Sequence, residues 1–457
     1  MEVEKTRISS ALLERATKNL SEAIRIKTIS GADEPYDEEF KAFHSFLERA
    51  YPLVHKNLRR EVIGRASLLF TWSGTNEELE PIVLAAHMDV VPVEEATLPD
   101  WTYPPFEGVV AGGEIWGRGT IDCKGQLIAV LEAVESLLGE GYVPSRTVYL
   151  AFGDDEEVRG YQGAAKIADL LEERGAKPFL VIDEGGILSE TGIPLLRRPL
   201  AAVGVADKGY VTLALKATGK GGHSSVPPRH TAIGILARAI TRIERHLFPA
   251  RATEVIIASI EKIAPELPLP LRAIFGNRRI CVLFLKIVSR QLDLLRPFLR
   301  NTAAVTMIKG GTKDNVLPQE AEAKVNIRLL PGETQETAIT AIRKIIRDKR
   351  ISIEIFGVAE NPPPISDSKS KGFAILEQTI KELFPQAIVF PYLLVGMTDS
   401  RHYSRISDSV FRFWPIRGGM KLFKLAHGTN ERISIENLGE MIIFYRRLIF
   451  NSCEVGL

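Results

Sequence analysis

The sequence has little cysteine and no concentration of charge of one sign. Its 457 residues include three cysteines, Cys123, Cys281 and Cys453, which are too few and too scattered for a disulfide framework or a cysteine-rich zinc module. The 58 basic and 57 acidic residues give a net charge of +1, without the one-sign runs of a polyanion-binding surface. We therefore expect a reducing compartment and no nucleic-acid partner.

Long apolar runs are also missing. Nowhere do about eighteen uncharged apolar residues follow one another, and the apolar stretch 433–450 contains Glu436, Glu440, Arg446 and Arg447. Residues 1–30 mix charged and apolar side chains at helical spacing, unlike the apolar core of a signal peptide. We expect no membrane span and a cytoplasmic protein, although a processed secreted chain would have the same composition.

The length and the pattern of apolar residues indicate two domains, because single cores rarely grow beyond roughly 250 to 300 residues. From residue 66 to 187, apolar runs of strand length alternate with amphipathic helical patterns. This rhythm is typical of an α/β layer with a mainly parallel sheet. The strands are predicted at 82–86, 147–152 and 179–182.

A second rhythm begins near Val211 and predicts the order β-α-β-β-α-β of a ferredoxin-like unit. A segment with Pro265, Pro268 and Pro270, apolar up to Phe298, interrupts it as an insertion. The α/β rhythm resumes after 361–364, with a helix predicted at 373–383. We therefore expect a catalytic domain, residues 1–205 and 359–457, that is split by a smaller lid or dimerisation domain at 206–358.

Each predicted strand of the first rhythm ends in a polar cluster. These clusters are His87 and Asp89, then the acidic run 154–157, then Asp183 and Glu184. In open α/β sheets ligands bind at the carboxyl ends of the strands, so the clusters can share one crevice. Four successive carboxylates repel one another unless a cation is near.

Each motif also has a plainer explanation. A single histidine at a strand end is usually structural, and an acidic run is usually a solvated loop. The segment 117–125, Gly-Arg-Gly-Thr-Ile-Asp-Cys-Lys-Gly, resembles a phosphate cradle, but its spacing fits neither a P-loop nor a dinucleotide fingerprint. The repetition of polar clusters at three strand ends makes the plain explanations jointly improbable.

Taken together, the motifs resemble a known family of two-zinc exopeptidases and amidohydrolases, which includes aminoacylases, carboxypeptidase G, succinyl-diaminopimelate desuccinylase and Gly-X carboxypeptidase. The motifs, in the order and spacing of that family, are H-M-D-V-V-P (87–92), G-R-G-T-I-D (117–122), D-E-E (155–157), D-E-G-G (183–186), G-H-S-S (222–225), D-N-V-L-P (314–318), T-D-S-R (398–401) and H-G (427–428). The wording D-E-G-G and A-H-G-T-N-E is most similar to the branch of N-fatty-acyl-amino-acid synthase/hydrolases and Gly-X carboxypeptidases.

The resemblance implies a site with two zinc ions, for which manganese or cobalt could substitute. His87 and Asp183 would hold one ion, Glu157 and His427 the other, and Asp122 would bridge them. Asp89 would orient His87. Glu156 would be the general base that activates a water between the metals.

The resemblance also implies roles for residues outside the metal clusters. His223, in the inserted domain, would stabilise the oxyanion across a homodimer interface, whereas the plainer alternative is a histidine that caps a glycine-rich turn. Asn315, Arg328 and Arg401 are candidates for binding a substrate carboxylate. For Arg328 a structural ion pair is nearly as plausible.

The sequence thus predicts a hydrolase that cleaves an amide bond beside a free carboxylate, in an N-acyl amino acid or a short peptide. Two other hypotheses compete with it: a catalytically silent, metal-bound binding or scaffold protein, and a nucleotide-binding α/β protein. The retention of Asp89 and Glu156 disfavours the first alternative. The missing glycine fingerprint disfavours the second.

Overall fold

A computed structural model describes residues 8–31, 37–190, 196, 198–419, 422 and 424–454. The chain divides into two compact units. Unit 1 comprises the described residues up to Val205, Ser366–Tyr392 and those from Thr398 onward, and unit 2 comprises Ala206–Ile365 and Leu393–Met397.

Unit 1 is built on a nine-stranded sheet with the order β1-β2-β6-β3-β7-β17-β9-β16, in which β8 pairs with β9. The strands are β1 (Arg59–Ile63), β2 (Ser67–Trp72), β3 (Ile82–His87), β6 (Val148–Gly153), β7 (Leu180–Asp183), β8 (Ile187–Ser189), β9 (Leu200–Asp207), β16 (Ile388–Leu394) and β17 (Val410–Arg412). The central strands β6, β3, β7 and β17 pair in parallel, and the pairs β1–β2, β2–β6 and β17–β9 are antiparallel. The expected α/β class with a parallel sheet core is confirmed.

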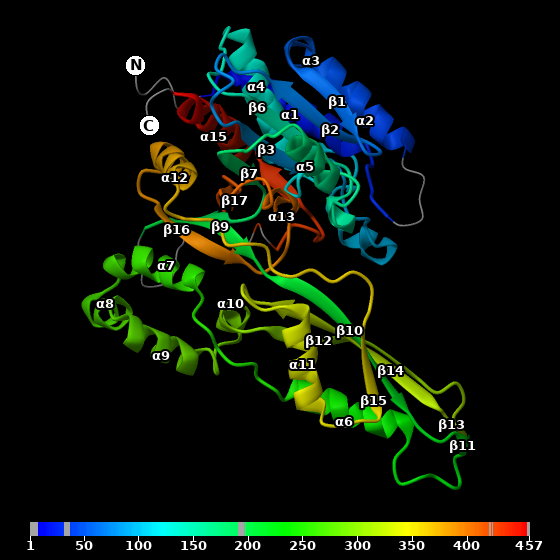
Figure 1. The fold of residues 1–457 in the computed structure, drawn as a ribbon. Helices are drawn as coiled ribbons and strands as arrows, with labels where there is room; N and C mark the ends of the chain where they lie inside the picture. Colours follow the sequence, from blue (N-terminus) through cyan, green and yellow to red (C-terminus); the bar gives the residue numbers. More distant parts are fainter. Residues whose placement is uncertain are drawn as a thin grey trace. The chain divides into compact units, whose positions relative to one another are not determined.

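Both faces of the central strands β3, β6 and β7 are buried, which explains why these strands are continuous apolar runs. Val83 and Ala151 point to one face and pack against Ile167 of helix α5 (Ala164–Glu173). Leu84 and Leu150, which are adjacent in sequence to Val83 and Ala151, are equally buried on the other face. The other helices of unit 1 (Figure 1) are α1 (Ser10–Arg25), α2 (Asp37–Ala50), α3 (Pro52–Asn57), α4 (Lys124–Gly139), α12 (Lys371–Leu383), α13 (Ser400–Tyr403) and α15 (Ile435–Cys453).

A small three-stranded sheet adjoins the loop that carries Asp122. It has the order β18-β5-β4, and its strands are β4 (Val109–Ala111), β5 (Glu114–Trp116) and β18 (Arg432–Ser434). Because β5 ends just before Gly117 and β18 begins just after Glu431, this sheet brings the segments 117–122 and 427–431 together.

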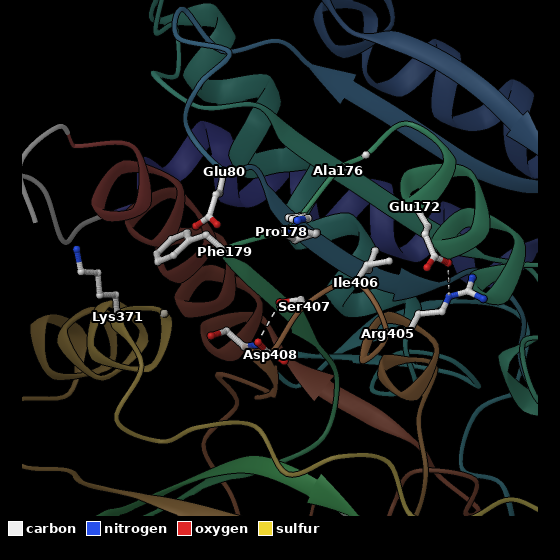
Figure 2. A pocket seen from close by; sticks show the side chains of 14 residues that line it. Glu80, Glu172, Ala176, Pro178, Phe179, Lys371, Arg405, Ile406, Ser407 and Asp408 are labelled. Atoms are coloured by element: carbon white, nitrogen blue, oxygen red, sulfur yellow. Dashed lines mark hydrogen bonds and ion pairs between the residues drawn. The ribbon is translucent and has the colours of Figure 1, made fainter.

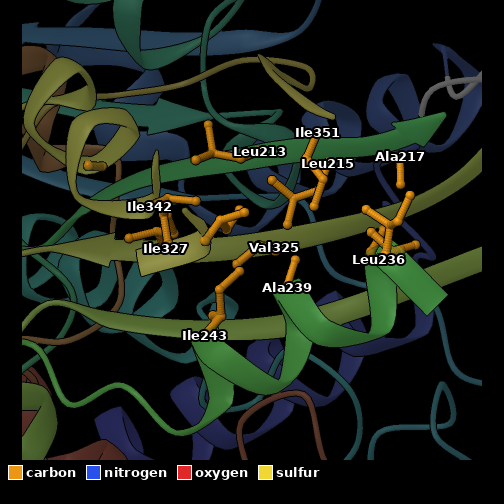
Figure 3. Packing of buried hydrophobic residues seen from close by; sticks show 14 of the residues in the cluster. Leu213, Leu215, Ala217, Leu236, Ala239, Ile243, Val325, Ile327, Ile342 and Ile351 are labelled. Carbon is orange, nitrogen blue, oxygen red and sulfur yellow. The ribbon is translucent and has the colours of Figure 1, made fainter. Parts of the chain in front are cut away.

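Unit 2 contains a four-stranded antiparallel sheet in the order β12-β14-β10-β15. Its elements are β10 (Gly209–Thr218), α6 (Ala232–Glu244), β12 (Thr302–Gly310), β14 (Glu320–Leu329), α11 (Gln335–Ile346) and β15 (Ile351–Ile355). This chain order is the β-α-β-β-α-β order of a ferredoxin-like unit. Figure 3 shows the core, in which Leu236 and Ile243 of α6 and Ile342 of α11 pack against Leu213 and Val325 of the sheet.

Two features interrupt this unit. The segment between α6 and β12 forms helices, α7 (Glu254–Ile263), α8 (Leu269–Gly276), α9 (Arg278–Val288) and α10 (Arg296–Leu299), in the region where the proline-rich insertion is expected. A short hairpin pairs β11 (Gly222–His223) with β13 (Val316–Leu317). In the described part of the chain no helix has the length and apolar character that a membrane crossing needs.

Candidate metal centre

Three parallel strands of unit 1 end in the polar clusters that the sequence indicates. His87 is the last residue of β3, Asp183 is the last residue of β7, and Glu156 begins a single 3₁₀ turn just after β6. Parallel neighbours finish at the same edge of a sheet, so these side chains gather there. His87 and Asp183 are almost completely buried.

Asp122 lies at the middle of the cluster, in the loop before α4. Its Oδ1 lies 2.9 Å from Nε2 of His87, and its Oδ2 lies 3.0 Å from Nε2 of His427. A second carboxylate approaches each histidine: Oε1 of Glu184 lies 3.3 Å from Nε2 of His87, and Oε1 of Glu157 lies 3.0 Å from Nε2 of His427. The carboxylate of Asp122 therefore faces two groups, each made of one imidazole and one further carboxylate.

The electrostatics of this cluster favour an added cation. Hydrogen bonds to Asp122 and Glu157 raise the pKa of His427 to about 10. Burial, and then the charge of Asp122, raise the pKa of Glu157 and of Glu184. Among the described residues, the buried Oε2 of Glu184 has no hydrogen-bond partner. Imidazole nitrogens and carboxylate oxygens are ligands that zinc accepts, so the donor set fits a metal.

Asp89 contacts both His87 and the turn that carries Glu156 and Glu157. It is completely buried, and its Oδ1 lies 3.3 Å from Nδ1 of His87. Its carboxylate accepts the backbone N–H groups of Glu156 and Glu157 at 3.2 and 3.0 Å, and the hydroxyl of Ser30 at 2.6 Å. Asp89 thus contacts both the turn that carries the two glutamates and the histidine, whose Nδ1 also lies 3.0 Å from the carbonyl oxygen of Asp89.

Glu431 fixes the loop of Asp122, a role that the sequence analysis missed. It is completely buried, and its Oε1 accepts the N–H groups of Ile121 and Asp122 at 2.9 and 3.2 Å. Its Oε2 accepts a hydrogen bond of 2.5 Å from Arg118, which also donates to the carbonyl oxygen of His427 at 2.9 Å. The signal in the sequence was the last residue of A-H-G-T-N-E.

Asp183 and Glu184 are placed differently from the expectation. Asp183 lies in the cluster, but its Oδ2 accepts the backbone N–H of Ser400 at 2.7 Å. The carboxylate close to His87 belongs to Glu184, and Glu184 groups with His87 and Cys123 at distances that allow a shared metal ion. The signal was present in D-E-G-G, where two carboxylates are adjacent.

Arg401 lies in unit 1, in contact with the end of the turn that carries the two glutamates. Its guanidinium donates to the carbonyl oxygens of Arg159 and Thr398 at 2.6 and 2.7 Å. Asp399, two residues earlier, is buried, and burial raises its pKa well above the usual value. These contacts give Arg401 a part in shaping the turn.

The remaining expected residues lie in unit 2. His223 is exposed in the β11–β13 hairpin, where its Nδ1 lies 2.7 Å from the hydroxyl of Ser225. Asn315 is in the same hairpin, since its carbonyl oxygen accepts the N–H of Ser224 at 3.2 Å. Arg328 lies on β14 with its guanidinium 4.9 Å from the centre of the Tyr210 ring.

Arg328 is far from this hairpin within unit 2. The hairpin precedes β14, which begins at Glu320, and the strand from Glu320 to Arg328 spans about 26 Å at ~3.3 Å per residue. The structure therefore brings His223 and Asn315 together and keeps Arg328 apart from them.

A pocket in unit 1, with a volume of about 560 Å³, lies elsewhere. Figure 2 shows its lining, with Phe179 and Pro178 just before β7 and Arg405 directed toward Glu172. It adjoins the amino end of β7, whereas the cluster around Asp122 follows the carboxyl ends of the strands. This pocket is separate from the candidate metal centre.

Several known proteins are similar to this chain in sequence and in fold. Residues 83–451 match the model of peptidase family M20/M25/M40. A probable carboxypeptidase S-like protein of Dictyostelium discoideum is 38% identical over 95% of this chain and 84% of its own length. The N-fatty-acyl-amino acid synthase/hydrolase of Bos taurus is 37% identical, over 94% of this chain and 86% of its own.

Solved structures of more distant proteins have the same fold. An M20 family metallo-carboxypeptidase from Sulfolobus solfataricus superposes with a TM-score of 0.70 at 20% identity, over 96% of this chain and 99% of its own. Human carnosine dipeptidase 1 gives a TM-score of 0.67 at 14% identity, over 99% and 100%. At these identities the likeness concerns the fold alone.

Proposed function

The chain belongs to peptidase family M20/M25/M40, and on this premise we propose that it hydrolyses the amide bond beside a free carboxylate in N-acyl amino acids or short peptides. The resemblance found in the motifs is thereby confirmed, and the chain is a metallopeptidase or amidohydrolase by family. The observation that carries the proposal is the carboxylate of Asp122, which faces His87 on one side and His427 on the other.

We propose that this cluster holds two zinc ions, with manganese or cobalt as substitutes. His87 and Asp122 would contribute to one ion, and Asp122, Glu157 and His427 to the other. The last ligand would come from the adjacent pair Asp183 and Glu184. The buried, unpartnered Oε2 of Glu184 favours Glu184 over Asp183, which the sequence had suggested.

Glu156 is proposed as the general base. Bound metal ions would supply acidity to a water molecule and would polarise the amide carbonyl. Glu156 would take the proton of the attacking water and pass it to the leaving nitrogen. Asp89 accepts the backbone N–H of Glu156 and also lies beside His87 of β3. The same residue therefore positions both the proposed base and a proposed metal ligand. A catalytically silent scaffold protein would not need a positioned general base.

The substrate class is tested by a panel of N-acyl amino acids of increasing chain length alongside dipeptides, each with a free and an amidated carboxylate. We expect hydrolysis of the free acids. We also expect loss of activity after chelation and recovery on addition of zinc, because the bound ions would activate the attacking water. Release of the amine is the measurement. Equal rates for free and amidated compounds would contradict the proposed carboxylate requirement, and full activity of the metal-free protein would contradict the metal requirement.

We further propose that the protein is a homodimer in which His223 stabilises the oxyanion in the site of the partner subunit. Strand β12 is at an edge of its sheet, and Met307 and Ile308 on it are 61% and 66% exposed. An exposed apolar edge strand is a template for pairing with another chain. Asn315, next to His223, and Arg328, far along β14, remain our candidates for binding the substrate carboxylate from two different chains.

Mixed dimers test the role of His223. His223→Ala and Glu156→Gln are each expected to be nearly inactive alone, but a mixture that exchanges subunits should regain about a quarter of the wild-type activity. Half of the dimers are then mixed, and one of the two sites in each has both residues. Hydrolysis after co-expression is the measurement. No recovery in demonstrably mixed dimers would place His223 in its own subunit's site, and full activity of His223→Ala alone would place it outside catalysis.

A further inference from the structure

The helical insertion of unit 2 has an unusual composition. The segment 267–300 contains seven basic residues and one acidic residue, Asp293. It therefore carries +6 while the whole chain carries +1, so the rest of the chain carries −5. The acid pairs with Arg296 at 2.9 Å and leaves the other cations without a counter-charge from the segment.

Helix α9 has two apolar sides. On one, Cys281 and Leu285 are buried in a small core with Phe275 of α8 and Leu299. On the other, Ile280, Leu283 and Ile287 are 50%, 60% and 54% exposed. Their spacing, i, i+3 and i+7, forms one stripe along the helix. The first side anchors the helix, and the second has no counterpart in unit 2.

Other apolar side chains of the segment are exposed too, and basic side chains flank the stripe. Leu269 at the start of α8 is 79% exposed, and Leu292 and Leu294, after α9, are 52% and 74% exposed. At 100° per residue, Arg279 and Lys286 flank the stripe of α9 along one edge, and both are exposed. We define these side chains as the insertion face.

We propose that the insertion face docks on an anionic membrane surface. A helix that has aliphatic residues on one side and Lys or Arg beside them lies in the plane of the interface, with its apolar stripe among the acyl chains. The α9 helix, with 11 residues, is too short to span a bilayer but long enough to lie on one. The net charge of −5 elsewhere would favour turning this basic face toward the anionic membrane.

The charge also argues against a second copy of the chain as the occupant. In a two-fold symmetric contact the same patch meets itself, so Arg279 and Lys286 would meet the same two cations of the other copy, and the insertion face has no acidic residue to compensate. Like charges opposed across an interface are costly. Nucleic acid would match the cations but would leave the aliphatic stripe without a partner. A membrane with anionic lipid satisfies both parts of the face.

Vesicle co-sedimentation of the full-length protein tests the proposal. We expect binding to phosphatidylcholine vesicles that contain phosphatidylglycerol, much weaker binding to phosphatidylcholine alone, and release at high salt, because surface charges are screened. The double variant Arg279→Gln/Lys286→Gln should bind about 20- to 30-fold more weakly, at about fivefold per basic residue. The variant Leu283→Ser/Ile287→Ser should lose at least about tenfold through the lost apolar area.

The matched control is Val143→Ser/Lys56→Gln, which replaces an exposed apolar and an exposed basic residue of unit 1 and should bind as the wild type does. All of these positions are exposed, so thermal unfolding should be unchanged. Absence of binding to anionic vesicles, or binding that the insertion-face variants retain, would overturn the proposal. So would loss of oligomer in the Leu283→Ser/Ile287→Ser variant without vesicle binding, since the face would then be an interface between copies. The assay measures binding alone and is independent of the proposed hydrolysis.

Discussion

Glu156→Gln is expected to lower kcat by about 10²–10⁴-fold, the usual contribution of a positioned general base. The side chain would keep its size and lose its capacity to take a proton. The N–H of residue 156 would still donate to Asp89, because glutamine changes nothing in the backbone. Metal content and thermal stability should therefore remain close to those of the wild type.

The measurements are kcat on the best substrate of the panel and metal content by elemental analysis. Glu173→Gln is the matched control, because it makes the same chemical change at an exposed position of α5 and should be neutral. If Glu156→Gln hydrolysed amides at the wild-type rate, the proposed mechanism would be wrong. If it lost metal as well as activity, Glu156 would be a ligand, and the role of the general base would need another residue.

Much of the fold was predictable because burial on both faces makes the central strands apolar throughout. The predicted strand 82–86 corresponds to β3 (Ile82–His87), and 147–152 to β6 (Val148–Gly153). In unit 2, the alternation of helical and strand patterns predicted the order of elements that the structure shows. A polar residue that directly follows a buried strand then indicates the edge of the sheet at which a site forms.

What the sequence could not supply is the direction of side chains beyond the strand ends. Asp183 ends β7, and the chain then turns through Gly185 and Gly186, which have φ values of +89° and +83°. In such a turn the alternation of strand residues no longer holds, so the side of each carboxylate is not predictable. Contacts between distant segments, such as Ser30 with Asp89 and Glu431 with Asp122, also leave no periodic signal.

The direction of the Asp183 and Glu184 side chains is the subject of the second prediction. Glu184→Gln is expected to reduce the metal content from two ions toward one per chain and to lower activity by more than about 10²-fold, beyond the 10- to 100-fold loss usual for a residue that only supports a ligand. Glu184 approaches His87 at 3.3 Å, and its second oxygen is buried without a partner in the described part of the chain. A neutral amide would leave His87 and Asp122 with too little negative charge to hold an ion.

Asp183→Asn is the paired variant, and it should behave differently. Oδ2 of Asp183 accepts the N–H of Ser400 at 2.7 Å, and the amide oxygen of asparagine can accept the same hydrogen bond. We therefore expect two ions per chain, with a metal affinity reduced by at most about 10- to 100-fold. Elemental analysis after dialysis against limiting zinc separates the two variants. If Asp183→Asn lost an ion and Glu184→Gln kept both, Asp183 would be the ligand, and the buried carboxylate of Glu184 would serve to orient His87.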